Sequence, residues 1–251
     1  MGLTSKSTGL SLLKNKYDTV KEEKDMIVIA LAGNPNTGKS TLFNTLTGLN
    51  QHTGNWPGKT VSNAKGTFKY KDKEFLLVDL PGTYSLLANS VEEEIARDFI
   101  CFGNPDITIV ITDATCLERN LNLVLQVMEI TDRVIVCLNL MDEAKRKGIS
   151  IDIEKLENRL GVPVIPTVAR DNKGIDKLLE TIYQMINGNI KANPYRLKYS
   201  DEIESIVEEI EPILAETLGA KYNTRWLALR LIDGDKAISN SIDNILKKYS
   251  D

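Results

Sequence analysis

Short apolar runs alternate with amphipathic stretches from Met26 to about Asn187. The apolar runs are strand-sized and predict strands over 26–32, 65–70, 74–79, 107–112, 133–139 and 163–166. The stretches between them have helical spacing and predict helices over 39–48, 91–102, 117–129, 153–160 and 174–187. This alternation predicts an α/β fold with a mostly parallel sheet and helices on both faces. Ligands of such sheets bind at the carboxyl ends of the strands.

The pattern changes after the segment 188–194, in which glycine, asparagine and proline interrupt it. Six apolar residues beyond it fall on one helical stripe: Ile203, Ile206, Val207, Ile210, Ile213 and Leu214. A second helix is predicted around Trp226 to Ile232, ending near Gly234, and a third around Ile238 to Leu246. We therefore divide the chain into a polar N-terminal extension (1–25), an α/β domain (26–190) and a small all-helical subdomain (195–251).

Composition narrows the function classes. The formal charge of −4 and the pI near 5.3 argue against broad nucleic-acid binding, which favours a basic surface. A hydrophobic content of 42% indicates a soluble globular protein, and no apolar run approaches the roughly 20 residues of a membrane span. The N-terminus lacks the apolar core of a signal peptide. Three widely spaced cysteines are expected to be free thiols, and with a single histidine a structural zinc site is not expected.

The segment Gly33-Asn-Pro-Asn-Thr-Gly-Lys-Ser40 lies between the first predicted strand and the first predicted helix, and it matches G-x-x-x-x-G-K-[ST]. Glycines let the backbone N–H groups of such a loop wrap a phosphate chain, and the positive end of the helix attracts the same charge. Lys39 is expected to reach the β- and γ-phosphate oxygens, and Ser40 to supply a hydroxyl to Mg²⁺. The predicted phosphate-binding residues are Gly33, Asn36, Thr37, Gly38, Lys39, Ser40 and Thr41.

A P-loop enzyme also needs a carboxylate at the end of a neighbouring strand to order the magnesium shell. Asp79 ends an apolar strand and opens the pattern D-x-x-G with Gly82, whose backbone N–H is expected to contact the γ-phosphate. The pattern recurs at Asp171 to Gly174, but only Asp79 ends an apolar strand in the right order. The predicted second switch, called switch II below, comprises Asp79, Leu80, Pro81, Gly82 and Thr83.

The base is predicted to be guanine. Asn139 and Asp142 form N-x-x-D directly after the strand predicted over 133–139. A carboxylate there accepts hydrogen bonds from guanine N1–H and the 2-amino group together, whereas adenine lacks both donors. The same pattern at 15–18 and 240–243 follows no predicted strand. These two matches are interpreted as accidental.

The segment Thr167-Val-Ala-Arg170 follows the last predicted strand, where G domains usually carry Ser-Ala-Lys or Ser-Ala-Arg. The N–H of Ala169 is expected to contact the guanine carbonyl. Val168 replaces the usual serine, so support of the loop by a hydroxyl is lost and nucleotide affinity is expected to be modest. The predicted ligand is GTP or GDP, held at the base by Asn139, Asp142, Val168 and Ala169.

At this point the chain resembles the family of ferrous-iron transport protein B, bacterial inner-membrane iron(II) transporters with an N-terminal G domain. The resemblance rests on GNPNTGKSTLFNTLTG, GNWPGKTV (54–61), DLPGTYSL (79–86), NLMDEAKRKG (139–148) and RWLALRLIDGD (225–235), and it covers nearly the whole chain from residue 26 onward. It implies a soluble cytosolic piece of a longer protein, at the cytoplasmic face of the membrane, whose membrane transport domain this chain lacks. It also implies that the helical subdomain steadies the GDP form, and it leaves a homo-oligomer open.

The resemblance assigns switch I to Gly54, Asn55, Trp56, Pro57, Gly58, Lys59 and Thr60. It implies that Thr60 ligates Mg²⁺ together with Ser40 and Asp79. It further implies that Asn36 helps to bind an activating potassium ion, with backbone carbonyls near Gly54 and Trp56 completing the site. The alternative for Asn36 is that it only stabilises the tight turn.

Hydrolysis is expected to be slow. Ras-like G domains orient the attacking water with a glutamine just after D-x-x-G. Thr83 stands at that position here, and no arginine occurs in 50–62 to act as a finger. Arg97 and Arg119 are predicted to be solvated charges on helix surfaces. A potassium ion would stand in for the missing arginine by offsetting the charge on the transferring phosphoryl group.

The sequence therefore favours a GTP-hydrolysing regulatory domain of a ferrous-iron transporter. One alternative is an RNA- or ribosome-associated GTPase, although such proteins normally add a basic module and the predicted helical subdomain is acidic. Another is a switch that binds GTP without turnover.

Overall fold

The computed structural model describes residues 26–48, 51–56, 59–219 and 221–249. The predicted N-terminal extension therefore lies outside the described residues. The chain forms two compact units with a boundary between Tyr195 and Arg196, and each unit is described by itself. None of the helices in the described residues combines the length and apolar character needed to cross a bilayer.

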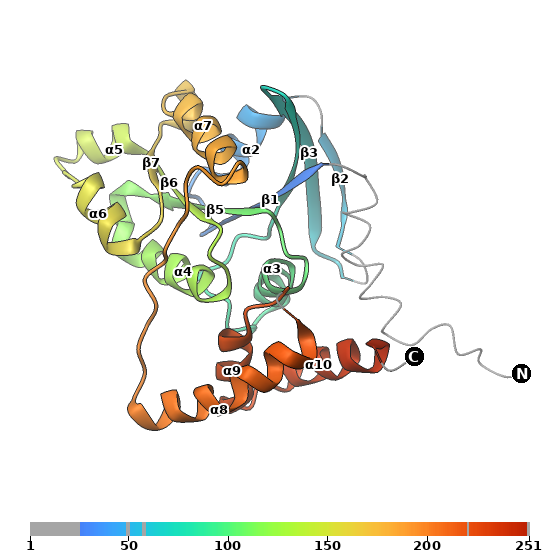
Figure 1. Cartoon of the computed structure of the whole chain (residues 1–251). Coiled ribbons are helices and arrows are strands. Elements are labelled where there is room, and N and C mark those ends of the chain that lie inside the picture. The colour runs from blue at the N-terminus through green and yellow to red at the C-terminus, as the bar shows by residue number, and fades with distance from the viewer. Residues whose placement is uncertain (1–25, 49–50, 57–58, 220, 250–251) are drawn as a thin grey trace, which may run out of the picture. The chain divides into compact units, whose positions relative to one another are not determined.

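The first unit is built on one seven-stranded sheet of order β2-β3-β4-β1-β5-β6-β7 (Figure 1). β1 pairs parallel with β4 and β5, and β6 and β7 continue the parallel part, whereas β3 runs antiparallel to both of its neighbours. The strands are β1 (Ile27–Gly33), β2 (Gln51–Asn55), β3 (Ser62–Tyr70), β4 (Lys73–Asp79), β5 (Ile107–Asp113), β6 (Val134–Asn139) and β7 (Val164–Pro166).

Helices cover both faces of this sheet, as the sequence predicts (Figure 1). Successive strand residues point to opposite faces. One face of the central strands packs with residues of α2 and α7 in a single hydrophobic cluster, while α4 contacts β5 and β6. The helices of this unit are α2 (Lys39–Thr47), α3 (Val91–Phe102), α4 (Leu117–Ile130), α5 (Met141–Arg146), α6 (Ile153–Leu160) and α7 (Ile175–Ile186).

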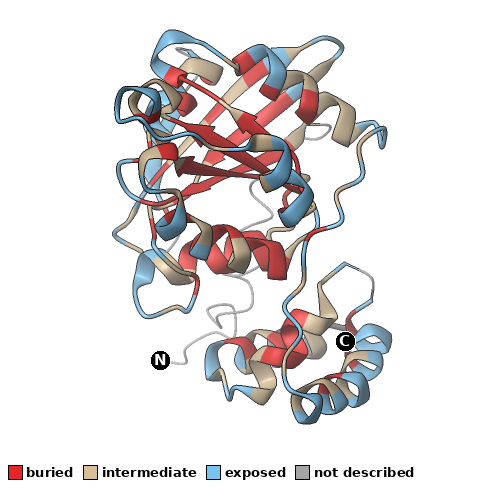
Figure 2. Ribbon diagram, turned by 90° about the vertical axis from the view of Figure 1, so that its left-hand side faces the viewer, coloured by how far each residue is buried: buried red, intermediate tan, exposed pale blue. Residues whose placement is uncertain are grey.

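The central strands are almost completely buried, so they read as continuous apolar runs (Figure 2). The fold class and all six predicted strands are confirmed. Two elements were not predicted. β2 is a polar edge strand with four of its five residues exposed, and α5 has only six residues, so neither carries an apolar repeat.

The described residues of the second unit form three helices, and the predicted all-helical character is confirmed. They are α8 (Asp201–Leu218), α9 (Thr224–Ile232) and α10 (Lys236–Tyr249). The predicted apolar stripe of α8 is narrower than expected, because Val207 and Leu214 are buried whereas Ile206 and Ile213 are 43% and 64% exposed. One residue along a helix turns the side chain by about 100°, which carries these two isoleucines off the packed face.

Candidate nucleotide site

The phosphate loop connects β1 to α2 and has the backbone shape that its glycines predict. Gly38 has φ +89, and a Cβ there would lie 2.3 Å from Asn139 Nδ2. A Cβ on Gly33 would lie 2.8 Å from the carbonyl oxygen of Ile111. Both positions therefore require glycine, the first for its conformation and both for the lack of space. Asn36 also has a positive φ, of 67°, a conformation that asparagine tolerates better than most residues.

The predicted phosphate-binding side chains are arranged in two ways. Thr37 is buried and its hydroxyl donates to the Asn34 carbonyl oxygen at 2.9 Å, which fixes the turn. Asn36, Ser40 and Thr41 are exposed at the loop and the first turn of α2. Exposed hydroxyls at a helix N-terminus are placed to contact a ligand.

Lys39, at the start of α2, meets Asp79 at the end of β4. Asp79 ends β4 and is in register with Leu31 of β1, and the Lys39 Nζ lies 2.5 Å from its Oδ1. The two side chains are only 12% and 20% exposed. Burial raises the pKa of the Asp79 carboxyl, and the ammonium of Lys39 opposes that rise. The structure thus brings together the cation and the carboxylate that the sequence assigned to one site.

This site suits Mg²⁺ by the chemistry of its donors. Mg²⁺ prefers oxygen ligands and is commonly held by one or two carboxylates together with phosphates and waters. Asp79 offers one desolvated carboxylate and Ser40 a hydroxyl. Among the described residues no group of three or more His, Cys, Asp or Glu forms a metal cage. A site of this kind depends on the phosphates of a ligand for the remaining contacts.

Switch I begins at the end of β2 and packs against α3. Trp56 is 1% exposed, and its ring meets Phe99 edge to face at a centroid distance of 5.5 Å. Lys59 Nζ lies 3.0 Å from Glu94 Oε2 on the same helix. Thr60 is exposed. Pro57 and Gly58 lie outside the described residues. Trp56 therefore anchors the loop internally and does not present its side chain to a partner.

Gly54 lies on the edge strand β2, whereas Asn36 lies in the loop that follows β1. β2 stands three strands from β1 in the sheet order, which at about 4.8 Å per step is roughly 14 Å. The carbonyl of Trp56 accepts a hydrogen bond from the Lys59 N–H at 2.9 Å. The potassium role assigned to Asn36, Gly54 and Trp56 stays a prediction.

Switch II runs under the phosphate loop from the end of β4. Leu80 is buried, and its N–H donates to the Leu31 carbonyl at 3.0 Å. Pro81 follows, and a Cβ on Gly82 would touch Pro35 at 3.5 Å. Thr83 is 5% exposed, with its N–H 3.3 Å from the Gly33 carbonyl. A short, buried Thr83 side chain is poorly suited to orient a water above the loop.

Asn139 joins the phosphate loop to the loop after β7. Its Nδ2 donates to the Thr37 carbonyl at 3.0 Å, and its Oδ1 accepts from the Ala169 N–H at 3.0 Å and the Thr167 hydroxyl at 3.2 Å. The side chain is buried. The Ala169 N–H, expected to reach the guanine carbonyl, thus donates to Asn139 in this structure. Thr167 was not predicted to take part, and its position directly after a strand is the signal that could have found it.

Asp142 lies in the first turn of α5, next to the loop after β7. Leu140, two residues before it, has φ +61 and turns the chain sharply at the end of β6. The Oδ2 of Asp142 accepts a hydrogen bond from Arg170 Nη2, a pairing that the sequence did not predict. Val168 is buried and exchanges two backbone hydrogen bonds with Lys173, at 3.0 and 3.2 Å. This bridge supports the loop where the usual serine is missing.

Arg97 corrects the prediction of a solvated charge. It is 1% exposed and its guanidinium bonds the neighbouring Asp98 carboxylate at 2.8 and 3.0 Å. Buried charges are held by such pairs. Arg119 stacks over the Tyr84 ring, 4.3 Å from the centroid, and so covers part of the segment after switch II.

Comparison with known proteins places this geometry in a family. A family model described as ferrous iron transport protein B matches residues 27–182, and a model of the FeoB cytosolic helical domain matches residues 199–250. The Fe(2+) transporter FeoB of Escherichia coli (strain K12) is 41% identical over 214 residues. That alignment covers 83% of this chain and 27% of the relative, so the chain spans about a quarter of the length of the curated relatives it matches.

Solved structures agree with the fold. The cytosolic domain of the T. maritima FeoB iron transporter in a GDP form gives a TM-score of 0.78 at 37% identity, covering 88% of this chain and 85% of that chain. Its GMPPNP form gives 0.79 at 37% identity, with coverage of 88% and 86%. The fold is therefore a P-loop G domain followed by a helical domain.

The Lys39–Asp79 pair predicts a pH effect. In Lys39→Met the pKa of Asp79 should rise further above its ordinary value of 3.8, because burial remains and the opposing cation is lost. A carboxyl whose pKa is raised by folding makes the folded protein less stable as the pH rises from the ordinary pKa to the folded pKa. This pH window should therefore widen in Lys39→Met. An NMR titration of the Asp79 carboxyl carbon measures it, with Lys173→Met as a control. An unchanged or lower pKa would contradict the assignment.

Proposed function

Because this chain belongs to the ferrous iron transport protein B family, we propose that it binds GTP and hydrolyses it slowly to regulate iron(II) passage through a membrane domain. The observation that carries the proposal is the Asn139 junction, which fixes the phosphate loop beside the loops predicted to read the base. We place the G domain at 26–190 and the helical domain at 195–251, at the cytosolic face of the membrane.

Nucleotide binding is supported by the loop itself. The bend from Gly33 to Thr41 offers backbone N–H groups and the start of α2 to an anionic chain, and Lys39 adds a positive charge. The Gly82 N–H would meet the γ-phosphate. The GDP and GMPPNP forms of the T. maritima relative are consistent with such a ligand.

Guanine selectivity is proposed for Asp142, with Asn139, Val168 and Ala169 shaping the surrounding pocket. Its carboxylate lies at the carboxyl edge of the sheet, where the base of a nucleotide held by the phosphate loop would arrive. An acidic acceptor at that point favours a base with two adjacent donors and disfavours adenine.

Slow hydrolysis follows from what surrounds the γ-phosphate position. Thr83 occupies the place of a water-orienting glutamine and is buried. The residues that would hold Mg²⁺ are Ser40, Thr60 and Asp79, and the ion would neutralise charge on the β- and γ-phosphate oxygens. The residues that would hold K⁺ are Asn36, Gly54 and Trp56, after switch I moves inward. Charge on the transferring phosphoryl would then be offset without an arginine.

The base-reading role of Asp142 has a direct test. Asp142→Asn should weaken GTP binding about 10- to 100-fold, because hydrogen bonds to a charged acceptor contribute about 1.5–3 kcal/mol. It should in turn strengthen binding of xanthosine triphosphate, whose 2-oxo group accepts from the new amide. Isothermal titration with both nucleotides measures the switch.

Asp243→Asn is the matched control, since Asp243 ends a second N-x-x-D pattern on the exposed side of α10. It should leave both affinities unchanged. Retention of wild-type GTP affinity by Asp142→Asn would refute guanine recognition by this residue.

The potassium role of Asn36 is tested separately. Phosphate release from GTP should be several-fold faster in potassium than in sodium chloride at equal ionic strength. Asn36→Gly should abolish the difference while keeping the turn, because glycine adopts φ +67 without strain. Asn36→Ala should abolish it too. If the glycine variant retained potassium stimulation, or if both salts gave equal wild-type rates, Asn36 would be only a turn residue.

A further inference from the structure

The two carboxylate oxygens of Asp142 have different surroundings. Oδ1 is buried and has no hydrogen-bond partner among the residues that the structure describes. Oδ2 accepts from the guanidinium of Arg170. A buried acceptor without a donor is unfavourable, and native proteins seldom keep one without a functional reason. One oxygen therefore lacks a donor that a ligand could supply, and the other is already engaged.

Guanine needs both of these oxygens. Its N1–H and 2-amino group are parallel donors, and a carboxylate accepts them with one oxygen each. Resting on the guanine specificity proposed above, we propose that Arg170 is a displaceable counter-ion of Asp142. It pairs with Oδ2 in the nucleotide-free protein and leaves that oxygen when guanine binds, so that it lowers guanine affinity and sharpens base selection.

Arg170 is placed to move away at little cost. Its side chain is 53% exposed, whereas that of Asp142 is 24% exposed. Two other carboxylates lie near the same guanidinium: Glu143 Oε1 at 3.7 Å from Nη1, and Asp171 Oδ1 at 3.7 Å from Nε. A guanidinium that leaves Asp142 thus stays close to two other negatively charged carboxylates. Exposed ion pairs are weak, so the competition should change affinity by only a few-fold.

The same pair would act differently on adenine. An adenine base brings no adjacent donor pair, so it would neither displace the guanidinium favourably nor satisfy Oδ1 of Asp142. Arg170 would stay on Oδ2 and occupy the edge where the base must fit. Arg170 would therefore raise the ratio of guanine to adenine affinity even though it weakens guanine binding itself.

A positioning role for Arg170 makes the opposite prediction. If the ion pair served to orient Asp142 toward the base, its removal would weaken guanine binding. The sign of the effect therefore separates displacement from positioning.

The test measures GDP affinity and dissociation with a fluorescent GDP analogue in wild type and in Arg170→Met, which keeps much of the side-chain length without the charge. The dissociation constant should fall about two- to fivefold, with slower release. ADP affinity should rise by a larger factor, so that the ratio of GDP to ADP affinity falls in the variant. Thermal unfolding monitored by circular dichroism shows that the variant is folded.

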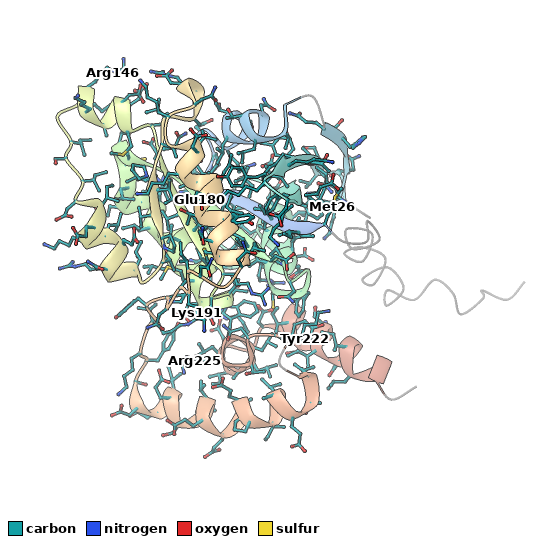
Figure 3. All side chains as sticks on the ribbon, turned by 45° about the horizontal axis from the view of Figure 1, so that its top comes forward. Met26, Arg146, Glu180, Lys191, Tyr222 and Arg225 are labelled. Carbon is teal, nitrogen blue, oxygen red and sulfur yellow. The ribbon has the colours of Figure 1, made fainter. Side chains whose placement is uncertain are left out.

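Arg146→Met is the matched control. Arg146 lies at the end of the neighbouring helix α5, at the outer edge of this unit, and pairs with Glu143 at 2.6 Å (Figure 3). The Arg146→Met substitution removes the same charge close to the site without changing a contact of Asp142. Its GDP affinity should equal that of wild type. An equal gain in both variants would show a general charge effect and overturn the proposal.

A double-mutant cycle isolates the pair. In an Asp142→Asn background the neutral amide no longer attracts the guanidinium, so Arg170→Met should leave xanthosine diphosphate affinity unchanged. Weaker or unchanged GDP binding by Arg170→Met alone would overturn displacement while leaving guanine recognition intact. Failure of the wild type to bind any guanine nucleotide would instead overturn the proposed function, and this inference with it.

Discussion

The site depends on one buried side chain that holds two distant loops in register. The amide of Asn139 donates to the phosphate loop at Thr37 and accepts from the base loop at Ala169, which are 102 and 30 residues away in the sequence. Because both bonds are buried, losing either leaves a polar group without water. A single amide at the end of β6 thereby links the phosphate loop to the loop proposed to contact the base.

The glycine at position 38 makes this arrangement possible. Any side chain at Gly38 would occupy the place of the Asn139 amide nitrogen. Around this junction each ligand-facing carboxylate pairs with a cation of its own, Lys39 on Asp79 and Arg170 on Asp142. In the proposed site an incoming nucleotide would exchange partners with groups that are already charge-compensated, so that these half-buried carboxylates never stand alone. Such exchange suits a domain that must release its ligand as well as bind it.

Much of the fold and the shape of the phosphate loop could be predicted because they rest on local patterns. Buried parallel strands give apolar runs, and the phosphate loop is contiguous in sequence. The edge strand β2 and the short α5 carry no apolar period, so they were missed. The Arg170–Asp142 pair and the burial of Arg97 depend on packing between segments, which spacing along the chain does not reveal. The position of Gly54 on an edge strand follows from strand order, which was not predicted strand by strand.

Calorimetric titration of the wild-type chain with GTP and with ATP, both with magnesium, is the most direct test of guanine recognition at this site. The phosphate cradle is common to both ligands, and only the base edge facing Asp142 differs between them. If Asp142 reads the base, GTP binding should be saturable and at least about 100-fold tighter than ATP binding, because a charged acceptor gains two donors from guanine and none from adenine. Equal affinities for the two nucleotides, or binding of neither, would contradict it.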